Sequence, residues 1–291
     1  MGCEKGQHGA GAGSSVPRER RTESIDSPTL PPYITPVGGV SPRSFCRNRR
    51  DDDPIGFLAP LGTTMATSVL IQGSLEVPFL RSLGEFRTWA ASEAYPQQAR
   101  IDFIAGRIEV DRSPEDLYCH GILKTRLVIA LGQIIDAGDL GELFSDITRI
   151  SSPQADLSAE PDLVFVSYDA LESGRVRRVP KVTGEPRRFV ELEGAPDLVV
   201  EIVSDESVGK DTQRLPAAYY QAGIPEFWLL DARKDHLGFQ IHQRAETGFE
   251  PVAPDANGFQ HSAVFDRSFR LSRRQARAGG WQYDLQQKPA N

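Results

Sequence analysis

From residue 79 onward, the spacing of the apolar positions alternates between helical and extended periods. Residues 79–93 place their large apolar side chains on one helical face, which predicts a short amphipathic helix. Residues 101–110 then alternate on either side of Ala105-Gly106, which predicts two short strands joined by a tight turn. The domain therefore begins with a helix followed by a β-hairpin.

A long helix is predicted over residues 113–138. Ser113 suits the N-cap, and Pro114 suits the first helical position because its missing N–H has no partner there anyway. Gly138 stands where the last turn ends, as expected of a residue that stops a helix.

The rest of the chain is rich in strand patterns. Residues 161–168 and 196–204 are almost continuously apolar, which is typical of strands buried on both faces. The polar stretch between them, residues 172–187, predicts a surface loop. Further strands are predicted at 141–152, 225–233, 237–244 and 249–264, and a helix at 212–222. This order predicts one α/β domain with a mixed central sheet, a long helix on one face and a shorter helix near the edge that carries the site.

Residues 1–64 have a different composition, rich in Gly, Pro, Ser and Arg with few apolar positions at any period. This composition predicts a disordered tail before a domain at 65–291. Met65 is the only methionine after Met1. One hypothesis is therefore that translation starts at Met65, and the alternative is a genuine disordered tail.

Charge and cysteine content restrict the classes of function. The net charge is −7, with a pI near 5.4, which argues against non-specific coating of nucleic acid. It argues less against a metal-dependent nuclease, whose carboxylates are offset by bound cations. Three scattered cysteines form neither a disulfide framework nor a zinc motif, and no apolar run approaches the ~18 residues of a membrane span. We therefore expect a cytoplasmic protein that contacts no membrane.

Two Pro-Asp dipeptides, at Asp162 and Asp197, each precede a buried strand. Glu201 interrupts the second strand, and a buried carboxylate without a partner is costly. Carboxylates on neighbouring strands can converge on a hard cation such as Mg²⁺. The alternatives for Glu201 are an ion pair with an arginine or a position facing solvent, and Asp197 is more typical of a strand-start turn.

The order of these segments resembles the Uma-type restriction-endonuclease family, a branch of the PD-(D/E)xK nuclease superfamily. The matching segments are EPDLVFVS, GAPDLVVEIVS and KDTQRLPAAYYQAGIPEFWLLDAR, with IDFIAGRIEV and His120 upstream, so the resemblance covers most of residues 100–283. It implies a restriction-endonuclease-like core in which Asp162 and Glu201 hold Mg²⁺ or Mn²⁺ and position a water against a phosphodiester.

The sequence departs from the family at the catalytic lysine. The superfamily position two residues after Glu201 is Val203, and the family's alternative position in the next helix is Leu215. Three basic residues are candidates for the role of the missing lysine. Lys210 ranks slightly ahead of Lys124, which shares a helical face with His120, and Arg214 is the third.

Other polar residues have weaker assignments. Glu109 points away from its apolar neighbours and could assist as a further acid, and His120 could ligate metal, orient water or simply be a core histidine. Glu160 is expected to be solvated. The arginines of residues 175–178 and 187–188 could contact phosphates, or lie in a solvated loop.

These observations predict divalent-metal-dependent phosphodiester hydrolysis by an endonuclease acting on DNA. The resemblance also implies a possible homodimer with two sites facing two strands. The alternative is a catalytically degenerate nuclease fold with a binding or regulatory role, which the missing lysine and the acidic pI favour. A carboxylate-pair glycosidase has little support, because nothing in the sequence indicates a sugar-binding cleft.

Overall fold

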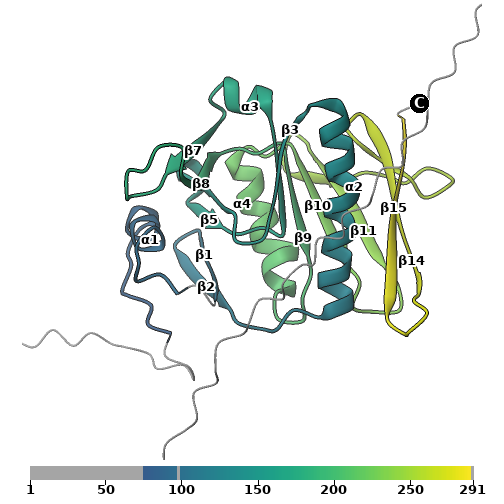
Figure 1. Cartoon of the computed structure of the whole chain (residues 1–291), viewed down its shortest axis with the longest axis horizontal. Helices are drawn as coiled ribbons and strands as arrows, with labels where there is room; N and C mark the ends of the chain where they lie inside the picture. The colour runs from purple at the N-terminus through teal and green to yellow at the C-terminus, as the bar shows by residue number, and fades with distance from the viewer. Residues whose placement is uncertain (1–74, 97–98, 290–291) are drawn as a thin grey trace, which may run out of the picture. The chain divides into compact units, whose positions relative to one another are not determined.

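The computed structural model describes residues 75–96 and 99–289 (Figure 1). The predicted tail at 1–64 and the proposed start at Met65 lie outside these residues. Within them the predicted α/β fold is confirmed, with strands arranged in three sheets instead of one. No helix in the described ranges is long and apolar enough to cross a membrane.

The central sheet has the strand order β12-β11-β10-β9-β6-β3. Its β9 and β10 are parallel and the other neighbours antiparallel, so the sheet is mixed as predicted. The two Pro-Asp runs form its middle. Every side chain of β9 is buried, and every side chain of β6 except the last is buried. The bounds are β3 Gly141–Ser145, β6 Leu163–Ser167, β9 Leu198–Ile202, β10 Glu226–Asp231, β11 Gly238–Arg244 and β12 Phe249–Pro251.

Helices cover both faces of this sheet because its strands are apolar on both. The long helix α2 (Leu123–Gly138) packs on the face that carries Leu163, Leu198 and Val200. The shorter helix α4 (Leu215–Ala222) packs on the opposite face, against Val164 and Val199. Alternate residues of a strand point to opposite faces, so Glu201 shares the α4 side with Val199. This alternation decides which helix can contact the Glu201 carboxylate.

The second sheet has the strand order β2-β1-β5-β4-β8-β7, and β4 and β8 are its parallel pair. Helix α1 (Leu83–Ala90), capped by Ser82, contributes Phe86 and Trp89 to a small core with Ile101 and Phe103 of β1. The bounds are β1 Arg100–Ile104, β2 Arg107–Asp111, β4 Arg149–Ser152, β5 Leu157–Ala159, β7 Val176–Pro180 and β8 Phe189–Gly194, with η2 (Pro153–Ala155) between β4 and β5 and α3 (Tyr168–Glu172) after β6.

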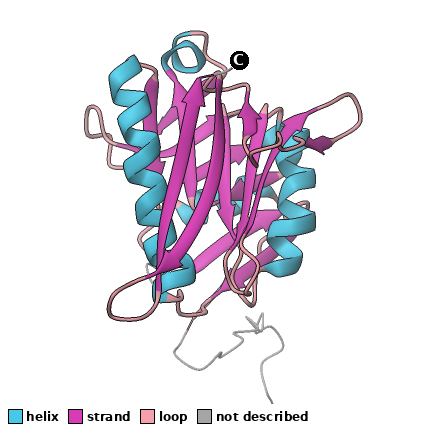
Figure 2. Cartoon of the chain, turned by 90° about the vertical axis from the view of Figure 1, so that its right-hand side faces the viewer, coloured by secondary structure: helices cyan, strands magenta, loops and turns pink. Residues whose placement is uncertain are grey.

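The third sheet is formed by β13 (Gln260–Ser262), β14 (Arg267–Gln275) and β15 (Trp281–Pro289). Its Phe269, Tyr283 and Leu285 share a core with α2, so α2 is covered by sheet on two sides. Figure 2 shows the long β14–β15 hairpin from its outer side.

Three sequence predictions about local structure need correction. Residues 141–152 are not one strand, because Asp146 and Ile147 both adopt left-handed φ (43° and 52°) and send β3 and β4 into different sheets. The stretch 172–187 is not only a loop, because it contains β7. The long helix is not capped by Ser113, whose N–H and hydroxyl donate to Asp111.

The helix begins instead with a wide π-helical segment, η1 (Leu117–Ile122), capped by the Asp116 carboxylate. The second site helix begins in the same way, with η3 (Lys210–Arg214) leading into α4. Pro216 lies in the first turn of α4, where the missing N–H of proline is tolerated.

Candidate active site

Asp162 lies in the short link between β5 and β6 and is completely buried. The backbone N–H of Ile202 donates to its Oδ2 at 2.7 Å, so the Asp162 carboxylate is fixed to the strand that carries Glu201. The two predicted metal ligands are therefore neighbours, because Glu201 lies in β9 and Asp162 directly precedes β6, which pairs with β9.

Three basic side chains converge on the other oxygen of Asp162. The distances from Oδ1 to Arg100 Nη2, His120 Nε2 and Lys124 Nζ are each 3.2 Å. Burial raises the pKa of Asp162, but the contacts with His120, Arg100 and Lys124 together outweigh it and hold this pKa well below its usual range. Asp162 is therefore an ionised carboxylate in a buried, positively charged setting.

Glu201 is 2% exposed, so it does not face solvent, and its partner is a hydroxyl group. The Tyr219 hydroxyl of α4 donates to Glu201 Oε1. Burial, and then the charges of Asp211 and Asp162, raise the pKa of Glu201 well above its usual range. The neighbouring Glu201 and Asp162 carboxyl groups therefore have pKa values displaced in opposite directions, a pattern found where one site holds a proton and a charge close together.

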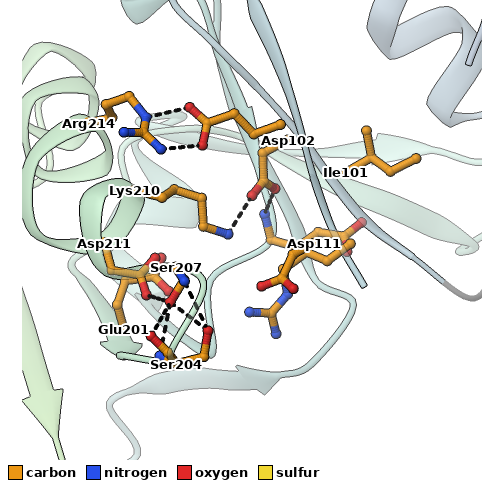
Figure 3. Close-up of polar contacts among 12 residues, drawn as sticks. Ile101, Asp102, Asp111, Glu201, Ser204, Ser207, Lys210, Asp211 and Arg214 are labelled. Carbon is orange, nitrogen blue, oxygen red and sulfur yellow. Dashed lines mark hydrogen bonds and ion pairs between the residues drawn. The ribbon is translucent and has the colours of Figure 1, made fainter. Parts of the chain in front are cut away.

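Lys210 and Asp211 begin η3 and are both buried (Figure 3). Lys210 Nζ donates to Asp102 Oδ2 at 3.0 Å, and the other Asp102 oxygen accepts the N–H of Glu160 at 3.0 Å. Burial lowers the pKa of Lys210, but Asp102 and Glu201 more than compensate and raise it. Burial also raises the pKa of Asp211 to about 6, against the effects of Lys210 and the Ser207 hydroxyl.

The residues around Asp162 fit a divalent cation. Glu115, His120 and Asp162 offer one ligand atom each, and these atoms lie within 4.8 Å of one another. His120 Nδ1 is buried without a hydrogen bond, although it lies 3.1 Å from Glu115 Oε2. A cavity of about 200 Å³ opens beside them, lined also by Arg100 and Ser207. Carboxylate oxygens with one imidazole suit Mn²⁺, and Mg²⁺ would use the oxygens with water.

The structure separates the predicted site residues into groups. His120 and Lys124 contact Asp162, as their shared helical face suggested, whereas Lys210 contacts Asp102. Glu109 instead forms a pair with Arg214, with 2.7 Å between Oε2 and Nη2. Neither member of that pair is among the side chains that contact Asp162 in the described ranges.

Two further expectations can be compared with the structure. Leu215 and Val203 are buried apolar residues, so both positions of the family lysine lie within the core. Glu160 is not solvated, because its carboxylate is buried and pairs with Arg149.

Several polar residues of the site were missed in the sequence. Asp102 interrupts the apolar strand β1 in the same way that Glu201 interrupts β9, so the same argument could have found it. Arg100 at the start of β1 and Glu115 near the predicted helix start resemble ordinary surface charges in sequence. Tyr219 lies on the apolar face of α4, and nothing local indicates that its hydroxyl meets a carboxylate.

The mixed α/β fold gathers buried carboxyl groups and basic side chains beside its central sheet, which marks this cluster as the candidate functional site. The family model Uma2, described as "Putative restriction endonuclease", matches residues 84–272, and the chain belongs to this family. The resemblance found in the sequence is thereby confirmed.

Among solved structures, the chain is similar to a crystal structure described as a putative nuclease belonging to DUF820 from Anabaena variabilis ATCC 29413. The identity is 19%, the TM-score is 0.45, and the match covers 63% of this chain and 90% of that chain. No curated protein matches the chain.

Proposed function

We propose that the protein is a divalent-metal-dependent endonuclease that hydrolyses phosphodiester bonds in DNA, with Asp162 and Glu201 as its principal metal-binding carboxylates. The observation that carries this proposal is the buried polar cluster at the middle of the central sheet. Asp162, directly before β6, is 0% exposed, and Glu201, within the otherwise apolar β9, is 2% exposed. Burying such groups costs several kcal/mol unless they are compensated, so they are typical of a functional site.

The metal would be held by Asp162 and Glu201, with His120 and Glu115 next to Asp162. When bound, it supplies a water of lowered pKa and stabilises charge on phosphate oxygens. The chain's own cations add to this environment. Arg100 lines the cavity, and Lys124 contacts the same Asp162 oxygen as Arg100, so both cations are placed to act on a phosphate bound there. In this proposal Lys124 has the role of the missing lysine, because its Nζ is the lysine nitrogen in contact with Asp162.

Lys210 has a different role in the proposal. Its ammonium group neutralises Asp102 and reduces the repulsion between Glu201 and Asp211. Lys210 therefore positions the acids of the site and keeps them compatible with burial. Glu109 and Arg214 form an ion pair between β2 and η3, and the proposal places them outside the metal site.

The test is cleavage of supercoiled plasmid and of labelled oligonucleotides by the full chain with Mg²⁺ or Mn²⁺. Asp162→Ala, Glu201→Gln and Lys124→Met are each expected to reduce the rate at least about a hundredfold, because each removes a proposed metal ligand or the cation beside it. Asp205→Asn is the matched control, since that side chain is 91% exposed. Full activity in Asp162→Ala would refute the assignment.

A degenerate, binding-only domain is the second candidate, and the apolar residues at 203 and 215 favour it. Calorimetric titration with Mn²⁺ separates the two functions. A nuclease requires an ion site that Asp162→Ala destroys, whereas a binding module can bind DNA with no such site. The homodimer belongs to the proposal as well, and light scattering of the full chain would test it.

A further inference from the structure

A second cleft, of about 530 Å³, lies between the β3–β4 turn and the β7–β8 hairpin of the second sheet. Its lining includes Tyr95, Ile147, Phe189 and Val190. Ile147, Phe189 and Val190 are 75%, 49% and 41% exposed, which is unusual for large apolar side chains that lie close together. The cleft therefore presents an apolar, partly aromatic surface to solvent.

Two short stretches of backbone connect the lining of this cleft with Asp162. Asp146 pairs with Lys124, its N–H donates to the carbonyl of Asp162 at 3.4 Å, and the next residue, Ile147, lines the cleft. Glu160 lines the cleft and precedes Asp162 by two residues, a separation of at most about 7 Å along the backbone. The cleft therefore lies within a few residues of Asp162 along the chain.

The turn that carries Ile147 is strained. Asp146 and Ile147 have φ of 43° and 52°, a region that a β-branched residue rarely adopts. The Asp146 contacts with Lys124 and Asp162 hold the turn in this conformation. Such strain concentrates at functional sites, and its effect here is to keep an isoleucine exposed beside the site.

The charges around the cleft favour an anionic occupant. Both acids of the lining are already paired, Glu160 with Arg149 and Glu191 with Arg87. Arg187 lines the cleft and has no acidic partner within the part of the chain that the structure describes.

Arg178 at the opposite rim pairs with Glu142 and lies 6.0 Å from the centre of the Phe189 ring. The other arginines singled out in the sequence, Arg175, Arg177 and Arg188, are all ion-paired. Arg178 therefore lies over the Phe189 ring, and Arg187 supplies the unpaired positive charge of the described lining.

We propose that this cleft binds unpaired bases of the DNA strand next to the phosphate held at Asp162. Phe189 is the stacking platform, Ile147 is a wedge that separates bases, and Arg187 contacts the backbone phosphates. Aromatic platforms combined with a basic rim are the means by which proteins bind single strands without sequence preference. The inference rests on the proposed function and specifies its substrate as DNA with unpaired or readily unpaired nucleotides.

The test is fluorescence anisotropy with a labelled single-stranded oligonucleotide and the matching duplex, using the full chain in EDTA so that no cleavage occurs. Phe189→Ala is expected to weaken single-strand binding about 5- to 100-fold with little change for the duplex, and Phe189→Tyr to retain the affinity. Arg187→Gln is expected to reduce the salt dependence of binding by about one phosphate contact. Val182→Ala is the control, because Val182 is 78% exposed on the same segment and outside the cleft.

Wild-type affinity in Phe189→Ala, or equal losses for single strand and duplex, would overturn the proposal. The result is independent of catalysis. Phe189-dependent binding by a protein that cuts no substrate would refute the proposed nuclease activity and support the proposed base-binding cleft. Metal-dependent cutting, together with single-strand binding that is insensitive to Phe189, would refute only the proposal that the cleft binds bases.

Discussion

Replacing Asp211 with Asn should make the protein more stable above pH 6 and leave its stability little changed below pH 4. Burial raises the pKa of Asp211 from its usual 3.8 to about 6. The folded state therefore binds a proton more tightly than the unfolded state does. Stability falls as pH rises between these two values and is constant above them. The displacement corresponds to a loss on the order of 3 kcal/mol, which Asn, being neutral, does not suffer.

The measurement is urea unfolding of wild type and Asp211→Asn from pH 4 to pH 8 in EDTA, followed by tryptophan fluorescence. Asn can still accept the Ser207 hydroxyl, while Oδ1 of Asp211 has no hydrogen bond in the described structure. Any packing difference between the two side chains therefore adds a constant offset. Only the pH dependence of the difference in unfolding free energy between wild type and Asp211→Asn reports the cost of the buried charge.

Asp205→Asn provides the control, because it replaces an exposed carboxylate on the same segment with the same amide. The reasoning is refuted if the free-energy difference between wild type and Asp211→Asn is the same at pH 4 and pH 8. That result would mean that the charge of Lys210 fully compensates the burial of Asp211.

Three further predictions concern the same site and its support. Tyr219→Phe should cost about 1–3 kcal/mol at pH 8, measured by urea unfolding, because it leaves the buried Glu201 carboxyl without its hydrogen bond; an unchanged midpoint would contradict this. Leu127→Ala should cost about 2–5 kcal/mol by the same measurement, since its fully buried side chain joins α2 to the central sheet. Mn²⁺ at about a hundred times its Kd should add about 2.7 kcal/mol to wild type and nothing to Asp162→Ala, measured by thermal unfolding.

The parts of the fold that follow from local pattern could be predicted from the sequence. The apolar runs of β6, β9 and β10 and the periodicity of α2 identify the central sheet and its covering helix. Glu201 could also be recognised as unusual, because its charge interrupts the apolar run of β9, and in the structure it is buried among apolar neighbours.

Contacts between distant segments could not be predicted. Lys210 and Asp102 are 108 residues apart, and neither position carries a local signal of the other. The division of residues 141–152 between two sheets depends on left-handed backbone at Asp146 and Ile147, where a glycine would have revealed the turn. The partners of Asp162 come from β1, η1 and α2, so its surroundings are a property of the tertiary fold.

The wide turns η1 and η3 have a consequence for how this site can change through insertion and deletion. A π-helical segment contains one residue more than the α-helical path that it replaces. Deleting one residue from Lys210–Arg214 would restore ordinary helix and rotate the preceding residues by about 100° relative to α4. Lys210 and Asp211 would then leave the site, while the contacts of α4 with the sheet would stay in register. The length of these two turns thus adjusts the chemistry of the site separately from the packing of the core.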